Sequence, residues 1–558
     1  MSASTPKKNS FFGGAAILTA SVIVVKLIGA LYKVPLGNIL TDAAFADFNT
    51  AYDIYSLLII ISTGGLPVAL SKMVSEANAL GRTNQVNKVF HLATVAFCIL
   101  GTISFLIMAV FPRELADAMK NSQAYWSIMA LAPAVFFICP MSAMRGYFQG
   151  HAQMTPTAVS QVIEALCKLV IGLALASAFK TSFEDEAMAA AGAILGVSVG
   201  CLLGAVYMYV CYRRHSRSQP RSNDEPEDSK AILTTLAALA IPITLSSSVI
   251  ALTNILDNAI LMGRLQDALG LSLDEARTLK GVYNKALTLY NLPASFMVPL
   301  TASVIPHVSA ALKVKRRRQA AQISETTLRT TALLAIPAGV GLFVLGEPII
   351  RLLYASTDVE LGGWMLSVLG AASIAVCFML VSNSILQAHR MVALPMTTTV
   401  IGCAMKLAVG YVLIGSEDIG IRGGPISTVV CFWLIALLDL FIIKRTLPRS
   451  LSMARVFVKP VGAAAAMGAA AWAVNGLCYQ LLVKLNLFLE LGEDEKPLLD
   501  AAGNALLSRT GTALSVAAAI GVAVVVYFAL ILVTRAISKE DLALLPKGDK
   551  IARILRVE

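Results

Sequence analysis

The chain has 558 residues, of which 57% are hydrophobic and 14% are charged, and its formal net charge is +11. Soluble domains are typically about 45–50% apolar and about 25% charged, so this composition excludes an ordinary soluble domain and indicates a polytopic membrane protein. In such a protein a surplus of Lys and Arg marks cytoplasmic loops, and we expect no nucleic-acid partner. The nine cysteines show no metal-ligand or disulfide spacing, and we expect no metal site.

Six apolar runs open the chain, each long enough for a spanning helix, which needs roughly 20 mostly apolar residues. They begin near Phe11, Ala51, Phe90, Tyr125, Pro156 and Ala187. A polar linker, residues 213–230, follows; it is charged and rich in Ser and Pro, without apolar periodicity. Eight further runs begin near Ile232, Gly281, Leu328, Gly363, Leu394, Gly424, Val456 and Thr510.

These runs predict an all-α membrane protein with about fourteen transmembrane helices, in two pseudo-symmetric six-helix lobes plus two extra C-terminal helices. The predicted divisions are 1–212 for the N-lobe, 213–230 for a cytoplasmic linker and 231–446 for the C-lobe. Residues 447–558 are expected to hold the last two helices and a cytoplasmic C-terminal tail.

Loop charges predict the orientation in the membrane. Basic residues gather in the loops of one side, and the termini, with Lys7, Lys8, Arg535 and Lys539, fall on that side too. The opposite loops, 181–186, 415–418 and 491–496, are acidic or nearly neutral. The positive-inside rule makes the basic side cytoplasmic, so we expect both termini in the cytoplasm.

The two halves of the chain share a sequence pattern. Gln149 matches Gln387 at an offset of 238 (387 − 149), and Lys168 matches Lys406 at the same offset (406 − 168). Because six spans precede the restart, both halves have one orientation, which implies a pseudo-two-fold axis along the membrane normal. Transporters built from two such parallel bundles bind their substrate near the midplane, between the bundles.

Four segments also carry a resemblance to a known family: KLIGALYKVPL (26–36), STGGLPVALSKMVSEA (62–77), RGYFQGHAQMTPTAVSQVIE (145–164) and IPITLSSSVIALTNILDNAIL (241–261). They resemble the stage V sporulation protein B group, within the polysaccharide-exporter branch of the superfamily that holds the MATE drug exporters and the MurJ lipid II flippases. The resemblance implies a two-lobed flippase of the bacterial plasma membrane. Such a flippase moves an undecaprenyl-pyrophosphate-linked saccharide, used in cell-wall, polysaccharide or spore synthesis, from the inner to the outer leaflet by alternating access.

One departure from the family concerns the residues that would bind phosphate. MurJ proteins of the Gram-negative type carry several cavity arginines on the first two helices. This chain has Lys26 and Lys33 on the first helix, and the apolar part of the second has no Arg. The resemblance therefore passes a phosphate-binding role to these two lysines alone.

Ionisable side chains inside the spans are the candidate cavity residues, because such a side chain at the bilayer centre costs at least ~2.5–3.5 kcal/mol. They are Lys26, Lys33, Glu164, Lys168, Lys285 and Lys406. Lys26 and Lys33 lie seven residues apart (33 − 26) and share a helix face. For Lys33, a side chain that extends to the interface is an equally good interpretation.

Glu164 and Lys168, four residues apart, predict an ion pair on one helix face, which could simply neutralise itself. The repeat places Lys168 and Lys406 at equivalent positions of the two lobes. We expect both ammonium groups to face one central cavity, where they would bind a diphosphate.

Three further sets of polar residues or glycines lie in or beside the spans. Asn254, Asp257 and Asn258 form a polar face that suits Na⁺ or a proton, or else an interhelical hydrogen-bond cluster. Lys285 could neutralise Asp257. A cytoplasmic gate or helix-end cap is predicted at Arg145, Gln149, Asn383 and Gln387, and a bend that could serve as a hinge at Gly64, Gly65 and Pro67.

The candidate cavity cations outnumber the acids, Glu164 and Asp257, which favours an anionic cargo such as a lipid-linked oligosaccharide. The alternative is a cation-coupled multidrug exporter of the MATE type. No nucleotide-binding loop and no large loop with paired carboxylates is present in the sequence, so we expect neither an enzyme nor an ATP-driven pump. We expect no cofactor, a monomer in contact with membrane lipids, and coupling to Na⁺, H⁺ or the membrane potential.

Overall fold

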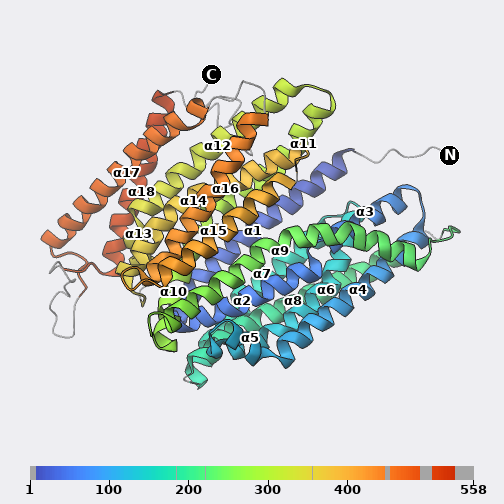
Figure 1. Ribbon diagram of the computed structural model, residues 1–558, viewed down its shortest axis with the longest axis horizontal. Helices are drawn as coiled ribbons and strands as arrows, with labels where there is room; N and C mark the ends of the chain where they lie inside the picture. The colour runs from blue at the N-terminus through green and yellow to red at the C-terminus, as the bar shows by residue number, and fades with distance from the viewer. Residues whose placement is uncertain are drawn as a thin grey trace. The chain divides into compact units, whose positions relative to one another are not determined.

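The computed structural model describes residues 8–183, 185–219, 222–354, 356–391, 393–446, 453–490 and 505–534. This part of the chain is helical, and an isolated antiparallel bridge between Leu489 and Leu507 is its β pairing (Figure 1). The predicted all-α membrane fold is confirmed. The loop 491–496, the C-terminal tail 535–558, Lys7 and the loop residue Arg449 lie outside the described residues.

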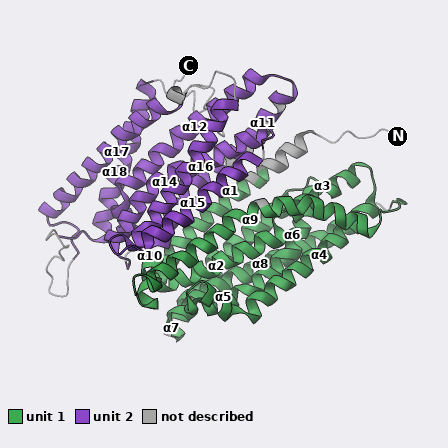
Figure 2. Ribbon diagram, viewed as in Figure 1, with its two compact units in different colours: residues 1–281 green, residues 282–558 purple. Residues whose placement is uncertain are grey.

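Packing divides the chain into two compact units, residues 1–281 and 282–558 (Figure 2). Unit 1 contains α1 (Lys8–Ile39), α2 (Asp42–Thr63), α3 (Leu66–Ala79), α4 (Thr83–Val110), α5 (Pro112–Ala118), η1 (Ser122–Ala124), α6 (Tyr125–Gly150), α7 (Thr155–Phe183), α8 (Glu186–Arg217) and α9 (Ser229–Asp267). Helix α10 (Leu273–Tyr290) runs across the boundary. Unit 2 continues with α11 (Leu292–Lys313), α12 (Arg317–Val344), α13 (Gly346–Leu353), α14 (Val359–Ala388), α15 (Ala393–Ile414), η2 (Gly420–Arg422), α16 (Gly423–Thr446), α17 (Met453–Lys484) and α18 (Arg509–Val533).

Twelve helices of the described chain are long and apolar enough to cross a membrane, and α9, bent by 41° between Leu245 and Ser247, makes a thirteenth if it counts as one span. They correspond to the predicted runs except the one expected near Gly281. That run is divided between α10 and α11, and α10 carries Arg277, Lys280 and Lys285. These charges explain why α10 is not apolar enough to count as a span.

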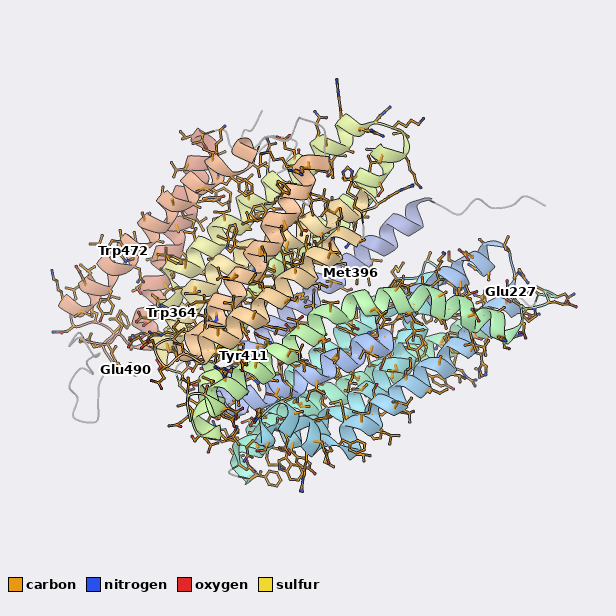
Figure 3. The ribbon with its side chains drawn as sticks, in the orientation of Figure 1. Glu227, Trp364, Met396, Tyr411, Trp472 and Glu490 are labelled. Atoms are coloured by element: carbon orange, nitrogen blue, oxygen red, sulfur yellow. The ribbon has the colours of Figure 1, made fainter. Side chains whose placement is uncertain are left out.

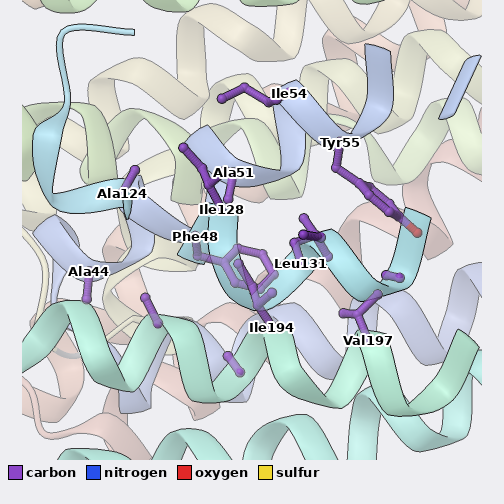
Figure 4. Packing of buried hydrophobic residues seen from close by; sticks show 14 of the residues in the cluster. Ala44, Phe48, Ala51, Ile54, Tyr55, Ala124, Ile128, Leu131, Ile194 and Val197 are labelled. Atoms are coloured by element: carbon purple, nitrogen blue, oxygen red, sulfur yellow. The ribbon is translucent and has the colours of Figure 1, made fainter. Parts of the chain in front are cut away.

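The core of unit 1 forms where α2 meets α6 and α8. One face of α2, with Ala44, Phe48 and Ala51, packs on Ile128 of α6 and Ile194 of α8 (Figure 4). Helix α7 lies along α8, and α1 lies along α7. Polar caps fix where the helices begin: the Thr41 hydroxyl accepts from the Ala44 N–H, and the Asp185 carboxylate accepts from the Ala187 N–H.

Helix α9 packs on α2, α3 and α4 and so belongs to unit 1, although the sequence repeat assigns it to the second lobe. Packing and the sequence repeat are different criteria for dividing the chain. The predicted lobe boundaries at residues 212, 230 and 446 therefore stay predictions. In unit 2, α14 packs against α11, α12 and α16, and α17 pairs with α18.

The backbone reproduces the sequence repeat. Helix α6 ends at Gly150 and α7 begins at Thr155; α14 ends at Ala388 and α15 begins at Ala393, each 238 residues later (388 − 150 and 393 − 155). The turn between them repeats as well: Ala152 and Arg390, again 238 apart (390 − 152), have φ of 56° and 64°. Such positive φ values are uncommon for residues with a side chain, which makes this agreement a specific one.

The linker is not a free tether, because residues 222–228 lie on the first turn of α4. The Asp224 carboxylate accepts the N–H groups of Asn84 and Gln85, at 3.0 and 2.9 Å, and caps that helix. Gln85 Oε1 accepts from the Glu227 N–H at 2.7 Å. Figure 3 labels Glu227 near one end of unit 1. Partial burial raises the pKa of Asp224, but hydrogen bonds from Ser222 and these two N–H groups outweigh it, and the pKa is lowered.

Candidate functional site

Lys168 is the centre of a polar cluster in unit 1. Its Nζ donates a 2.7 Å hydrogen bond to the Tyr52 hydroxyl and lies 4.4 Å from the centre of the Tyr52 ring and 4.8 Å from that of Tyr32. Two ring faces and a phenol stabilise an ammonium without neutralising it. Lys168 forms no salt bridge within the described residues, so an anion that approaches its Nζ displaces no carboxylate.

Two more lysines act on Lys168. Lys33 and Lys26, both on α1, interact electrostatically with it, and each makes the site more positive. Lys33 also interacts with Asp53 of α2, whose carboxylate offsets part of this charge. The structure therefore brings together three of the predicted cavity lysines within unit 1. Lys26 is exposed, and Lys33 is partly buried.

The predicted pairing of Glu164 with Lys168 does not occur; the structure pairs Glu164 with Arg145 of α6. Arg145 also donates to the Ser160 hydroxyl through Nε and Nη2, at 3.0 and 2.9 Å. The four-residue spacing of Glu164 and Lys168 indicates an ion pair within one helix and carries no information about a partner on another helix. Arg145, 19 residues earlier (164 − 145), reaches Glu164 across the α6–α7 turn and fills the role expected of the lysine.

The predicted cation face on α9 lies in the same unit. Asn258 is buried and donates a 2.7 Å hydrogen bond to Asp53, whereas Asn254 is exposed. Asp257 interacts electrostatically with Asp53 and with Lys280. The face therefore meets α2 and α10 as a network of acids, an amide and a lysine, and its role in binding Na⁺ or H⁺ stays a prediction.

Sequence analysis missed a buried ion pair. Arg277 of α10 donates two hydrogen bonds to the carboxylate of Asp47 on α2, at 3.0 and 2.5 Å. The Arg277 side chain is 7% exposed and the Asp47 side chain is 0% exposed. Asn121 donates to Asp47 as well, and Lys280 donates to Thr50 at 2.6 Å. The second span was predicted to begin near Ala51, which left Asp47 in a loop. The spacing of Asp47, Thr50 and Asp53, every third residue on one helix face, was the signal that could have revealed it.

Unit 2 repeats the lysine of unit 1. Lys406 follows the first residue of α15 by 13 residues (406 − 393), as Lys168 follows that of α7 (168 − 155). It is 8% exposed and interacts electrostatically with Tyr290, which lies 238 residues after Tyr52 (290 − 52). The repeat therefore places a lysine beside a tyrosine in each unit. Whether Lys168 and Lys406 share a cavity stays a prediction.

Lys285 and the predicted gate residues lie outside the cluster around Lys168. Lys285 is fully buried, with Nζ 5.3 Å from the centre of the Tyr354 ring. Among the gate residues, Gln149 and Asn383 are partly buried, and Gln387 is exposed. Their carbonyls serve the turns of the repeat: those of Gln149 and Gln387 accept the N–H groups of Ala152 and Arg390, both at 2.9 Å. These are main-chain bonds, and whether the two glutamine side chains act as a gate or as a helix-end cap stays a prediction.

The predicted bend in the second span is present. Helix α2 ends at Thr63 and α3 begins at Leu66, with Gly64 and Gly65 between them and Pro67 in the first turn of α3. A Cβ at Gly65 would lie 2.1 Å from the carbonyl oxygen of Ala240, so only glycine fits this crossing with α9. A hinge motion at this bend stays a prediction. No group of three or more His, Cys, Asp or Glu within the described residues could hold a metal ion.

Comparison with known proteins decides the family. The model of the family described as "Polysaccharide biosynthesis protein" matches residues 11–312, more than half of the chain. The chain belongs to this family. A second family model, MatE, matches residues 281–412. The chain is therefore a multi-pass membrane protein of the superfamily to which MATE and MurJ transporters belong.

The similarity to curated relatives covers most of the chain. It is 24% identical to "Stage V sporulation protein B" of Bacillus subtilis over 97% of this chain and 98% of the relative. It is 25% identical to "Lipid II flippase MurJ" of the same organism, over 72% of this chain and 77% of the relative. Among solved structures, the lipid II flippase MurJ in an inward closed conformation matches with a TM-score of 0.63, at 14% identity, over 93% of this chain and 98% of that one. An inward-facing MATE multidrug transporter matches with a TM-score of 0.62, at 14% identity, over 76% of this chain and 97% of that one. At such low identity these structures establish the fold alone.

Proposed function

We propose that the protein is a flippase that moves an undecaprenyl-pyrophosphate-linked saccharide from the inner to the outer leaflet by alternating access. The observation that carries the proposal is the cluster of Lys168, Lys33 and Lys26 in a polysaccharide biosynthesis protein, where Lys168 forms no salt bridge within the described residues. A pyrophosphate supplies the missing negative charge. Its saccharide stays with the polar groups of the protein while the lipid tail remains in the bilayer.

The chemistry of the cluster favours a phosphate over a carboxylate or a neutral sugar. Lysine is a compact, strongly hydrated point charge, and several lysines suit the several oxygens of a diphosphate. Tyr52 and Tyr32 hold Lys168 by ring contacts and one hydrogen bond, which an arriving phosphate oxygen can replace. Glu164, paired with Arg145, does not compete for this charge.

The relatives support a lipid-linked saccharide as the class of cargo, since one is described as a lipid II flippase. Lipid II, a spore-cortex precursor, a teichoic acid or a capsule unit all share the phosphate-linked polyprenyl carrier. We infer that the protein catalyses no chemical reaction, needs no cofactor, works as a monomer in the bacterial plasma membrane and keeps both termini in the cytoplasm. Na⁺, H⁺ or the membrane potential supplies the driving force; the potential is worth about 2.3 kcal/mol per charge per 100 mV.

The second candidate is a cation-coupled multidrug exporter, favoured by the MatE match and by acids that sequence analysis did not count. Asp47 and Asp53 add two carboxylates to unit 1. Arg277 neutralises the first, and Lys33, Lys280 and Asn258 surround the second. An organic cation would have to displace these partners, whereas a pyrophosphate meets Lys168 directly.

Depletion of the protein, followed by analysis of the lipid-linked saccharides on the cytoplasmic face, tests the proposal. We expect one such lipid to accumulate, and expression of the Lys168→Met variant to leave it accumulated. Lys180→Ala is the matched control, because Lys180 is an exposed lysine near the other end of the same helix and its Nζ donates to the Ile39 carbonyl. This variant should restore the normal level. Accumulated organic cations with unchanged lipid-linked saccharides would favour the exporter.

A further inference from the structure

The repeat leaves one carboxyl group without the cation that its counterpart has. In unit 1, Arg145, Ser160 and Glu164 form one cluster. The residues 238 later are Asn383, Thr398 and Gly402. The arginine is thus replaced by an amide, and the carboxylate of the second helix by a glycine.

Unit 2 supplies its carboxyl group from the neighbouring helix instead. In unit 1, Gly200 and Gly204 of α8 pack against Glu164. In unit 2, Cys431 and Ile435 of α16 pack against Gly402, the counterpart of Glu164, and so stand where unit 1 has Gly200 and Gly204. Asp439 follows Ile435 by four residues (439 − 435), one turn beyond the counterpart of Gly204, and its carboxyl group lies beside Thr398, the counterpart of Ser160.

Asp439 is fully buried, with 0% of its surface exposed. Its Oδ1 lies 2.7 Å from the Thr398 hydroxyl oxygen, and its Oδ2 is buried with no hydrogen-bond partner among the described residues. No salt bridge reaches it within that part of the chain. An isolated carboxylate buried in this way is so costly that the group takes up a proton instead.

Thr398 can serve both charge states without moving. Its oxygen lies 2.7 Å from Asp439 Oδ1 and 3.1 Å from the Pro395 carbonyl oxygen, but a hydroxyl has a single proton to donate. When Asp439 is ionised, Thr398 donates to it, and Thr399 still donates to Pro395 at 2.7 Å. When Asp439 is protonated, it can donate to Thr398, which donates to Pro395.

Other titratable groups on the packed elements do not duplicate this arrangement. Helix α14 carries Glu360 and Cys377 and is followed by the partly buried His389 and the exposed Arg390. The short helix η2 carries Arg422, and α16 itself carries Cys431 and the exposed Lys444 and Arg445. Helix α15 carries Cys403, Tyr411 and Lys406. Lys406 lies eight residues beyond Thr398 (406 − 398), or about 12 Å along the helix.

We propose that Asp439 is a proton-binding site, and that its loss and uptake of a proton accompany the conformational cycle of transport. The link to transport rests on the proposed function; the site itself does not. In the conformation described here the carboxyl group carries the proton. A conformation that opens this end of unit 2 to water allows the proton to leave, because hydration removes the cost of the charge.

Infrared difference spectroscopy of the purified protein, without any lipid substrate, tests the site directly. We expect the wild type to show the carbonyl band of a protonated carboxyl group at neutral pH, and Asp439→Asn to lose it. Thr398→Val should shift the band, since it removes the hydrogen bond. Glu347→Gln, which removes an exposed carboxylate paired with Arg351, is the matched control and should keep the band. A band unchanged in both Asp439→Asn and Thr398→Val would overturn the proposal.

Transport measurements in vesicles with a pH difference across the membrane test the coupling. Wild-type transport should respond to the pH difference, and Asp439→Asn, fixed in a neutral state, should not. A response that survives in Asp439→Asn would contradict the coupling. An Asp439 band in a protein that moves no lipid-linked saccharide would leave the proton site standing and refute the proposed function, so the two failures are distinguishable.

Discussion

At the scale of single residues, the partner of a buried charge decides what the charge can do. Glu164 is held by Arg145 and is part of a structural pair, whereas Lys168 contacts two tyrosines and forms no salt bridge within the described residues. Both residues looked alike in the sequence, as ionisable groups in an apolar helix. Their different partners separate a stabilising role from a binding role.

The ion pair of Arg145 and Glu164 makes a prediction about stability. Arg145→Ala leaves Glu164 without its cation, and an orphaned buried acceptor costs about 1–3 kcal/mol, more when it is charged. We expect the double variant Arg145→Ala, Glu164→Ala to melt at a higher temperature than Arg145→Ala alone, in thermal unfolding in detergent. Arg351→Ala, which breaks an exposed pair with Glu347, should change the melting temperature little.

If Arg145→Ala and the double variant melt at the same temperature, Glu164 is not left unsatisfied and the pair has no structural role.

The ion pair of Arg145 and Glu164 also shows what the spacing of residues in the sequence cannot predict. Residues four apart on a helix predicted an ion pair between Glu164 and Lys168, but the α6–α7 turn brings Arg145 closer. A tertiary contact of this kind is not encoded in the helical period of one segment.

At the scale of helices, glycines set how closely the membrane spans approach. Helices α7 and α8 cross where a Cβ on Gly196 would lie 2.4 Å from the Gly172 backbone. Two backbones in contact leave no space for a side chain, and small residues at such crossings are typical of membrane helices.

We therefore expect Gly196→Val to separate α7 from α8 and to lower the yield of folded protein in size-exclusion chromatography. Gly521→Val is the matched control, because a Cβ at Gly521 meets nothing within 4 Å. It introduces the same β-branched residue into a membrane helix, and it should behave as the wild type. Equal yields from the two variants would mean that the crossing at Gly172 is not tightly packed.

The docked linker predicts a dependence on pH. The hydrogen bonds that lower the pKa of Asp224 stabilise the docked state above the pKa of the undocked carboxyl group, and this stability is lost as the pH falls through the lowered value. Asp224→Asn should speed hydrogen exchange of the Asn84 and Gln85 amides at neutral pH. Asp228→Asn, which removes the charge of the residue that caps α9, should leave those amides unchanged. Similar exchange in Asp224→Asn and the wild type would contradict docking.

Most spanning helices could be predicted from their length and apolar composition, which are properties of local sequence. The charged helix α10 could not, because Arg277 and Lys280 find their partners on α2. A charged segment is stable in this position only when those partners are present. Docking of the linker on α4 could not be predicted either, because the polar composition of the linker is equally typical of a free tether.

At the scale of the whole molecule, the charge pattern predicts that the linker lies in the cytoplasm. Cysteine substitution at Ser218, after the end of α8, and at Thr181, in the loop expected outside, tests this orientation. In intact cells an impermeant thiol reagent should label the cysteine at position 181 and leave that at 218 unlabelled. The reverse pattern would invert the topology and the direction of transport with it.

The repeat links the two units through chemistry that both contain. Each has a lysine 13 residues into a helix and beside a tyrosine, while only unit 1 has the arginine that neutralises its carboxylate. Binding of one pyrophosphate by both lysines stays a prediction. The carboxyl groups have diverged, and in unit 2 the divergence leaves Asp439 without the arginine that Glu164 has in unit 1.

The central claim is that these lysines move a pyrophosphate-linked saccharide across the bilayer. The most direct test is a flipping assay with purified protein in proteoliposomes, using an undecaprenyl-pyrophosphate-linked saccharide and an organic cation as alternative cargoes. We predict that the wild type and Lys180→Ala translocate the lipid-linked saccharide, that Lys168→Met and Lys406→Met do not, and that none of them moves the cation. Normal flipping by Lys168→Met and Lys406→Met, or transport of the organic cation alone, would contradict the account.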